Sequence, residues 1–270
     1  MKNTLQVHLV QFSIAWEDQE KNYRNVLALL GKNPPAEGSV VCLPELFSTG
    51  YTMRAEKFAE NLHQSPTLRF LSGIAQFYEC FVIGSLIIRS KSGKPTNSAL
   101  ALSPEGKVLS RYDKIHLLPL GKEHKAYKQG NRTTAFKIKG KLFSILVCYD
   151  LRFPELFRIL YEKNVSGIFL LANWPAKRHD HWEILTQARA VENQCYLFCV
   201  NRTGRDPHHR FKGESRIIDP FGRVLSSSKS PGVVSKTVDI DHPEEEKKRL
   251  PFYSSRAKRI YKKYPPYNEP

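Results

Sequence analysis

The residue best suited to covalent chemistry in this sequence is a cysteine, Cys148, which ends the apolar run 143–148. The run is short and contains β-branched residues, which predicts a buried strand. Pro154 follows, and proline is favoured in the first turn of a helix. Cys148 is therefore predicted to lie on a sharp strand-to-helix turn, where a helix N-terminus would favour a thiolate and could bind an oxyanion. An inert buried cysteine is the alternative at this point.

Two more reactive groups follow predicted strands. Glu45 comes directly after the apolar segment 39–43, and Lys114 ends the strand predicted over 106–114. In α/β folds the carboxyl ends of strands gather at one cleft, so these groups could meet Cys148. A carboxylate there would serve as a general base, and an ammonium group would stabilise developing negative charge. Taken singly, each residue also fits an ordinary surface charge.

Strand and helix patterns alternate along the whole chain, which predicts an α/β fold. No repeat or linker interrupts them, so we expect a single domain over residues 1–270, with 251–270 as a C-terminal arm. The helix after Arg178 is expected to begin with a capping box formed by Asp180 and Glu183. The predicted strands are 5–11, 39–43, 81–89, 97–102, 106–114, 134–138, 141–147, 165–172, 195–201, 215–219, 224–226 and 233–240, and the predicted helices are 17–30, 65–78, 154–163, 180–194 and 241–250.

Composition narrows the class of protein. A chain of 270 residues with 41% hydrophobic residues can fill a substantial core. The five cysteines include no C-x-x-C pair, which predicts a reducing, cytoplasmic location without a disulfide framework or zinc site. The apolar runs are too short for a membrane span, and the N-terminus alternates like a strand rather than a signal peptide.

The net charge of +16 is concentrated in the second half of the chain. Nucleic-acid binding without catalysis is one interpretation, but no nucleic-acid motif accompanies the charge. We therefore expect no nucleic-acid partner and a basic surface that suits small anionic molecules. The segment 178–182 could suggest a metal cluster, but the capping box accounts for Asp180 better, so we predict no metal and no organic cofactor. Neither a serine-hydrolase elbow nor a phosphate loop is present.

The motifs around the three reactive residues resemble the nitrilase superfamily of carbon–nitrogen hydrolases, whose members carry a Glu, a Lys and a Cys in this order. The resemblance covers nearly the whole chain. The superfamily has a second acidic residue between the Lys and the Cys, and Glu123 stands at that position. The matching segments are 43–45, 112–117, 148–155, 173–175, 181–183, 188–193 and 213–222.

The resemblance implies a fold and a mechanism. The fold would be a four-layer α-β-β-α sandwich that forms homodimers or larger homo-oligomers, with the helix from Pro154 and the C-terminal arm as contact elements. Cys148 would attack an amide carbon to form a thioester, and Glu45 would act as base and then acid. Lys114 and the backbone N–H of Tyr149 would stabilise the oxyanion, with Glu123 holding Lys114 or the substrate in place.

Among the branches of the superfamily, the motifs look most like those of omega-amidases, which hydrolyse the terminal amide of 2-oxo acid amides such as 2-oxoglutaramate. Nitrilases and N-carbamoyl amino acid hydrolases share the same catalytic residues and stay as alternatives. The substrate would be a small and anionic amide. Tyr149, Asn173 and Trp174 are expected to form the wall of its pocket.

Overall fold

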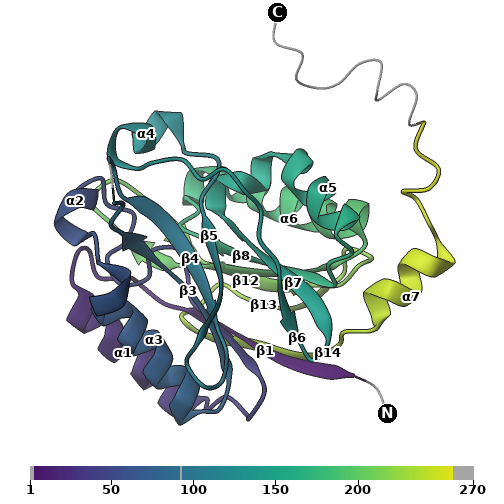
Figure 1. The fold of residues 1–270 in the computed structure, drawn as a ribbon, viewed down its shortest axis with the longest axis horizontal. Coiled ribbons are helices and arrows are strands. Elements are labelled where there is room, and N and C mark those ends of the chain that lie inside the picture. The colour runs from purple at the N-terminus through teal and green to yellow at the C-terminus, as the bar shows by residue number, and fades with distance from the viewer. Residues whose placement is uncertain (1–2, 92, 258–270) are drawn as a thin grey trace, which may run out of the picture.

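Two six-stranded β-sheets face each other in the middle of the molecule, with helices on both outer sides (Figure 1). The computed structural model describes residues 3–91 and 93–257. The predicted four-layer α-β-β-α sandwich is confirmed. The last part of the predicted C-terminal arm, residues 258–270, lies outside the described residues.

The first sheet carries the N-terminal half of the chain and has the strand order β14-β1-β2-β3-β4-β5. Its three central strands β1, β2 and β3 are parallel, and the remaining pairings are antiparallel. Helices α1 (Gln19–Lys32) and α3 (Pro66–Phe77) cover its outer side (Figure 1). The strands are β1 (Thr4–Gln11), β2 (Val40–Cys42), β3 (Phe81–Ile88), β4 (Thr96–Leu102), β5 (Val108–Asp113) and β14 (Gly232–Asp239).

The second sheet has the order β13-β12-β9-β8-β7-β6, with β7, β8 and β9 parallel. Helices α5 (Pro154–Glu162) and α6 (His179–Asn193) cover it on the side away from the first sheet (Figure 1). Its strands are β6 (Phe136–Ile138), β7 (Lys141–Val147), β8 (Gly167–Ala172), β9 (Tyr196–Asn201), β12 (Ser215–Ile218) and β13 (Val224–Ser228).

Several short elements complete the fold and were not predicted, except for α7 (His242–Arg249) near the C-terminus. They are α2 (Ala55–Phe58), α4 (Glu123–Ala126), the hairpin of β10 (Thr203–Arg205) and β11 (Arg210–Lys212), and the 3₁₀ turns η1 (Leu62–Gln64), η2 (Pro119–Gly121), η3 (Cys148–Arg152) and η4 (Ala176–Arg178).

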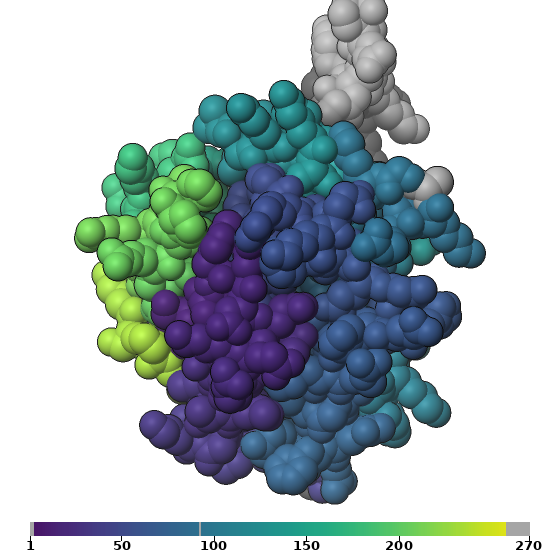
Figure 2. All heavy atoms as spheres, turned by 90° about the vertical axis from the view of Figure 1, so that its left-hand side faces the viewer, coloured from purple at the N-terminus to yellow at the C-terminus, as the bar shows by residue number. Residues whose placement is uncertain are grey.

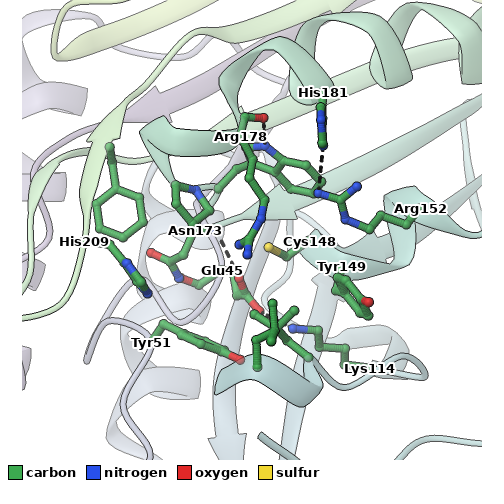
Figure 3. Close-up of a pocket in the computed structure, with 15 residues that line it drawn as sticks. Glu45, Tyr51, Lys114, Cys148, Tyr149, Arg152, Asn173, Arg178, His181 and His209 are labelled. Carbon is green, nitrogen blue, oxygen red and sulfur yellow. Dashed lines mark hydrogen bonds and ion pairs between the residues drawn. The ribbon is translucent and has the colours of Figure 1, made fainter. Parts of the chain in front are cut away.

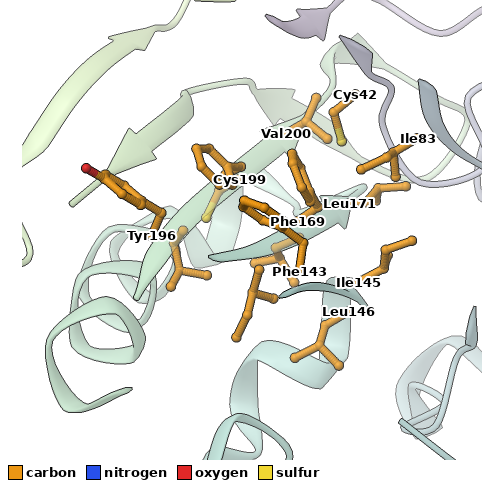
Figure 4. Close-up of a cluster of buried hydrophobic side chains, with 14 of the residues drawn as sticks. Cys42, Ile83, Phe143, Ile145, Leu146, Phe169, Leu171, Tyr196, Cys199 and Val200 are labelled. Carbon is orange, nitrogen blue, oxygen red and sulfur yellow. The ribbon is translucent and has the colours of Figure 1, made fainter. Parts of the chain in front are cut away.

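Both faces of the central strands are buried, which explains why the strands are apolar without alternation. In β2, Val40 and Cys42 face the second sheet, whereas Val41 faces the helices. Figure 4 shows Cys42 in the core between the sheets, near Leu171 and Val200 of the second sheet. This core between the sheets sets their separation, and therefore the distance between the residues that follow their strands.

The first and last strands of the chain lie side by side in the first sheet, where β1 pairs with β14 along its whole length. Figure 2 shows this side of the molecule, with the purple N-terminal part of the chain between the blue segment and the green to yellow segment from the last third. The spacing of Tyr23, Val26, Leu27 and Leu30 predicts that all four share the inner face of α1. The structure buries Tyr23, Val26 and Leu30, but Leu27 is 48% exposed. Asn22 takes the buried place instead, because its side chain bonds the backbone of Ala15 and Ser48.

The predicted capping box of α6 is wrong. The helix begins at His179, and Arg178 at the N-cap position makes no capping bond with its side chain. The 3₁₀ turn η4 runs directly into the helix, so Asp180 already lies within the first helical turn. Among the described residues, no helix has the length and apolar character needed to cross a membrane.

Candidate active site

The ends of strands from both sheets bring the three reactive residues to one cavity of about 330 Å³ (Figure 3). Glu45 follows β2 and Lys114 follows β5 in the first sheet, whereas Cys148 follows β7 in the second. All three side chains line this cavity. The candidate site therefore lies where the two sheets meet, and neither sheet holds it alone.

Cys148 lies on a tight turn with a left-handed backbone, at a φ of 45°. It begins the 3₁₀ turn η3, and α5 starts only after that turn, at Pro154. Asp150 pins the turn, because its Oδ2 accepts hydrogen bonds from the Val147 N–H at 3.0 Å and the Tyr112 hydroxyl at 2.7 Å. The sequence predicted the turn, but not that a 3₁₀ segment separates Cys148 from the helix.

The surroundings of Cys148 keep its sulfur protonated at rest. Burial, and after it the negative charge of Glu45, raises the pKa of the Cys148 thiol well above its ordinary value. Lys114 and a backbone N–H of Asn173 act in the opposite direction but do not outweigh them. The expected position of Cys148 at the start of the helix is not what the structure shows, since η3 separates it from α5. A thiol of this kind needs a base to become a nucleophile.

Lys114 is held between two buried carboxylates. Its Nζ lies 2.9 Å from Glu45 Oε1, and 2.9 Å and 3.0 Å from the two oxygens of Glu123. Burial alone would lower the pKa of Lys114, but Glu123 and Glu45 together raise it well above the ordinary value. The ammonium group is therefore charged across the physiological pH range and is a fixed positive charge beside the cavity.

Glu45 is fixed by donors on both carboxylate oxygens. Its Oε1 accepts from Asn97 Nδ2 at 2.9 Å as well as from Lys114, and its Oε2 accepts from the backbone N–H of Asn173 at 3.0 Å. The Asn173 side chain also donates to the backbone oxygen of Glu45 at 2.6 Å. Asn173, expected only in the pocket wall, thus also orients Glu45. Nothing in the sequence distinguished Asn97 from other polar residues in strands.

Glu123 connects Lys114 to the rim of the cavity. It opens the short helix α4 and is fully buried. Besides binding Lys114, its Oε2 accepts a hydrogen bond from the Leu118 N–H at 2.6 Å. Leu118 lines the cavity, so Glu123 fixes both the ammonium group and the loop beside it. We call the four candidate catalytic residues, Glu45, Lys114, Glu123 and Cys148, the catalytic floor.

Another part of the cavity lining is cationic. Arg152 and Arg178 line it, and no carboxylate pairs with either of them within the described ranges. The Arg152 guanidinium lies 4.9 Å from the Trp174 ring centroid, and its Nη2 lies 3.2 Å from His181 Nδ1 (Figure 3). Burial, followed by the charge of Arg178, lowers the pKa of Arg152. We call Arg152, Arg178 and His181 the cationic wall.

The other predicted wall residues, Tyr149 and Trp174, also line the cavity. Sequence reasoning missed the cationic wall itself. Arg152 could have been found, because it lies within the motif around Cys148 and on the same turn. Arg178 and His181 both lie in the segment 178–182, and His181 also lies in the family-matching segment 181–183, but neither was predicted as a wall residue.

One cluster of potential metal ligands lies apart from the cavity lining. Atoms of His179, Glu183 and Glu214 come within 4.8 Å of one another. Glu214 already binds His179 and Arg216, the latter at 2.9 Å, and its backbone oxygen accepts from Trp182 Nε1 at 2.9 Å. A guanidinium group on the same carboxylate opposes a cation there. The cluster therefore ties α6 to β12 and is no candidate metal centre.

Comparisons with known proteins agree with this geometry. A profile of the family described as carbon-nitrogen hydrolase matches residues 6–245. A protein named 2-oxoglutaramate amidase from Bacillus subtilis is 31% identical over 94% of this chain and 98% of its own length. Omega-amidase YafV of Escherichia coli is 34% identical over 83% of this chain and 85% of its own.

A solved structure gives the same answer for the fold. The protein XC1258 from Xanthomonas campestris, described as a CN-hydrolase superfamily protein with an arsenic adduct in the active site, superposes with a TM-score of 0.86. It is 32% identical, and the match covers 92% of this chain and 96% of that one. The chain therefore belongs to the carbon–nitrogen hydrolases of the nitrilase superfamily.

Proposed function

We propose that this enzyme is an omega-amidase, which hydrolyses the terminal amide of a 2-oxo acid amide such as 2-oxoglutaramate to the 2-oxo acid and ammonia. The observation that carries the proposal is one cavity lined by a sulfur, a carboxylate, a buried ammonium group and two arginines that have no carboxylate partner among the described residues. The named relatives from Bacillus subtilis and Escherichia coli support the same choice.

In the first half of the proposed reaction, Glu45 takes the proton from the Cys148 thiol as the sulfur attacks the amide carbon. The carbonyl oxygen becomes an oxyanion, which Lys114 Nζ and the backbone N–H of Tyr149 stabilise. The C–N bond then breaks, and Glu45 gives its proton to the departing nitrogen. Ammonia leaves, and the acyl group stays on Cys148 as a thioester.

In the second half, water replaces ammonia. Glu45 takes a proton from the water, whose oxygen attacks the thioester carbon and forms a second oxyanion. The C–S bond breaks, the sulfur recovers the proton from Glu45, and the carboxylic acid product leaves. Because Glu45 shuttles one proton in each half, its carboxylate needs the fixed position that Asn97 and Asn173 give it.

The cationic wall supports a substrate with a carboxylate. Arginine binds carboxylates through two parallel N–H donors, and neither arginine of the wall has such a partner within the described part of the chain. The amide carbon would lie at the floor and the carboxylate at the wall. A simple aliphatic nitrile carries no group for this wall, which favours the amidase over the nitrilase alternative.

The proposal is tested by ammonia release from a panel of 2-oxoglutaramate, glutamine, an N-carbamoyl amino acid and a short aliphatic nitrile. We expect the highest kcat/KM with 2-oxoglutaramate, and an acyl adduct on Cys148 in mass spectra of acid-quenched reactions. Activity confined to the nitrile or to the N-carbamoyl compound would overturn the substrate choice. The Cys148→Ala variant controls for contaminating amidases.

We also propose that the enzyme works as a cytoplasmic homodimer. Helices α5 and α6 contact each other and carry exposed apolar side chains, with Ile159 at 43%, Ile184 at 65% and Val191 at 41% exposure. All five cysteines are free, which suits a reducing compartment. Light scattering should give twice the chain mass, and Ile184→Lys should shift it to the monomer. A monomeric wild type would contradict the assembly but not the activity.

A further inference from the structure

The hydroxyl group of Tyr51 is buried at the cavity and is left without a hydrogen-bond partner in the described part of the chain. An unpaired buried hydroxyl typically costs about 1–3 kcal/mol, so native structures rarely keep one without a use. The other buried tyrosines in the described part of the chain differ from Tyr51 in this respect. Their hydroxyls are paired, as for Tyr23 with Thr67, Tyr112 with Asp150, Tyr127 with Thr52 and Tyr196 with Asp239.

The Tyr51 ring lies at the catalytic floor rather than at the cationic wall. Lys114 Nζ is 5.3 Å from its ring centroid, and Figure 3 shows the Tyr51 hydroxyl directed toward the side where Lys114 and Glu45 lie. Burial raises the pKa of Tyr51, and the opposing effect of Lys114 does not cancel this. The group is therefore a neutral hydroxyl that keeps its proton at every pH at which the enzyme would be assayed.

The loop above the ring leaves room for this hydroxyl. A Cβ added to Gly121 would come within 3.2 Å of Tyr51 Oη, which is a tight contact. The φ of Gly121 is not positive, so its backbone does not itself require glycine. The missing side chain at Gly121 instead keeps the Tyr51 hydroxyl free to point into the cavity.

We propose that the Tyr51 hydroxyl donates a hydrogen bond to the acyl oxygen of the substrate, as a third donor beside Lys114 and the Tyr149 N–H. The inference rests on the proposed amidase mechanism and extends it. Tyr51 keeps its proton throughout, so no bond to it forms or breaks. The hydrogen bond strengthens when Cys148 attacks, because the acyl oxygen then carries a full negative charge.

The test is Tyr51→Phe, which removes the hydroxyl and leaves the ring. Loss of one oxyanion donor typically lowers kcat about 10²–10³-fold, and we expect a fall in this range with KM changed less than about threefold. Tyr127→Phe is the matched control. The Tyr127 hydroxyl donates to the backbone oxygen of Thr52, and Tyr127 is not among the residues that line the catalytic cavity. This control variant should lower the melting temperature and leave kcat near that of the wild type.

Two outcomes would overturn the proposal. An unchanged kcat in Tyr51→Phe would show that the hydroxyl only packs beside Lys114. A raised KM for 2-oxoglutaramate with kcat unchanged would assign it to the 2-oxo group instead. Because every amide and carbamoyl substrate has an acyl oxygen, the kcat effect is expected with whichever of them the wild type hydrolyses. A failed substrate choice is therefore distinguishable from a failed role for Tyr51.

A second variant keeps the proposal testable if Tyr51→Phe does not fold. Gly121→Ala would press a methyl group against the Tyr51 hydroxyl and displace it. We expect a loss of about tenfold in kcat, since the donor is shifted rather than removed. An unchanged kcat in Gly121→Ala would contradict the proposal. Where Tyr51→Phe does fold, the double variant should lose no more than Tyr51→Phe alone, and additive losses would also contradict the proposal.

Discussion

The catalytic floor and the cationic wall face the same cavity but are built in opposite ways. On the floor, Lys114 is 1% exposed and Glu45 and Glu123 are fully buried, and all three are bonded to one another or to backbone groups. On the wall, Arg152 and Arg178 are half-buried and have no carboxylate partner in the described part of the chain. The charges of the catalytic floor are paired within the protein, whereas the arginines of the cationic wall are available to an anionic ligand.

This difference separates two tasks. Buried charges that already have partners do not reorganise during a reaction, so the floor is suited to stabilising a transition state. Half-buried charges without partners gain most when an anion arrives, so the wall is suited to binding and specificity. Changes to the floor should therefore act on kcat and on stability, whereas changes to the wall should act on KM.

Replacing the nucleophile should have the largest effect. Cys148→Ala is expected to lower kcat on the order of 10⁶-fold, as loss of the nucleophile does in other hydrolases with covalent intermediates. The variant should fold normally, because the hydrogen bonds that hold the turn come from Asp150 and not from the Cys148 side chain. Ammonia release and a thermal melt check both points. Turnover near that of the wild type would show that Cys148 is not the nucleophile.

Glu123→Gln should affect both stability and rate. The change removes one of the two negative charges that compensate buried Lys114, and breaking such a pair typically costs about 3–5 kcal/mol. We expect a fall of about 3 kcal/mol in the free energy of unfolding, and a loss of about 10²-fold in kcat because Lys114 and the Leu118 loop shift. Denaturant titration and steady-state kinetics measure the two effects.

The control for Glu123→Gln is Glu155→Gln, which removes a carboxylate from the surface at the start of α5. It should change neither quantity. If both variants unfold at the same denaturant concentration as the wild type, Glu123 does not stabilise the floor.

Arg152→Gln should mark the wall as a binding surface. A hydrogen bond to a charged group contributes about 1.5–3 kcal/mol, which corresponds to about 10–100-fold in KM for a carboxylate substrate. The KM for a neutral short amide should stay within about twofold, and kcat should be preserved for both. Equal effects on the two substrates would mean that Arg152 acts through structure and not through the carboxylate.

The pH dependence of alkylation tests the state of the thiol. Because the pKa of Cys148 is raised, the thiolate fraction at neutral pH is smaller than that of an exposed cysteine, whose pKa is about 8.5. Iodoacetamide labelling of Cys148 should therefore rise about tenfold per pH unit up to at least pH ~9, without a plateau near neutrality. Mass spectrometry of the labelled peptide follows the rate. A plateau near pH ~7 would indicate a stabilised thiolate.

The smallest expected effect concerns how the wall is oriented. An arginine only donates, so the 3.2 Å contact requires His181 Nδ1 to accept from Arg152. His181→Ala should raise KM for the carboxylate substrate about threefold, and His181→Asn, whose Oδ1 can also accept, should restore part of it. His208→Ala is the control, because His208 packs on Trp16 outside this cavity. Equal KM values for all of these variants would contradict the role of His181 and would show that Trp174 alone orients Arg152.

The order of strands and helices could be predicted from the sequence, because the central strands are apolar runs. Their arrangement in four layers was implied only by the resemblance to the nitrilase superfamily. The turn at Cys148 was also predictable, since an apolar run, a reactive residue and Pro154 follow one another. The start of α6 was not, because the spacing of Asp180 and Glu183 imitates a cap while η4 determines the actual beginning. Local patterns do not reveal a preceding 3₁₀ turn.

The site residues that depend on contacts between the two sheets were harder to predict than those that lie in sequence motifs. Glu45, Lys114 and Cys148 carry motifs of their own, so they could be singled out before any geometry was known. Asn97 and Tyr51 could not, since their importance comes only from what lies opposite them. The protonated state of Cys148 also needed three dimensions, because it depends on a carboxylate more than a hundred positions away in the chain.

The left-handed backbone at Cys148 limits what evolution or engineering can put there. A side chain branched at Cβ is rarely tolerated at positive φ, so threonine would strain the turn, whereas serine would fit. If the reacting sulfur is replaced by a hydroxyl oxygen, serine is therefore the side chain that fits. Any redesign of this enzyme toward a hydroxyl nucleophile has one compatible residue, and its success would depend on whether Glu45 can deprotonate so weak an acid.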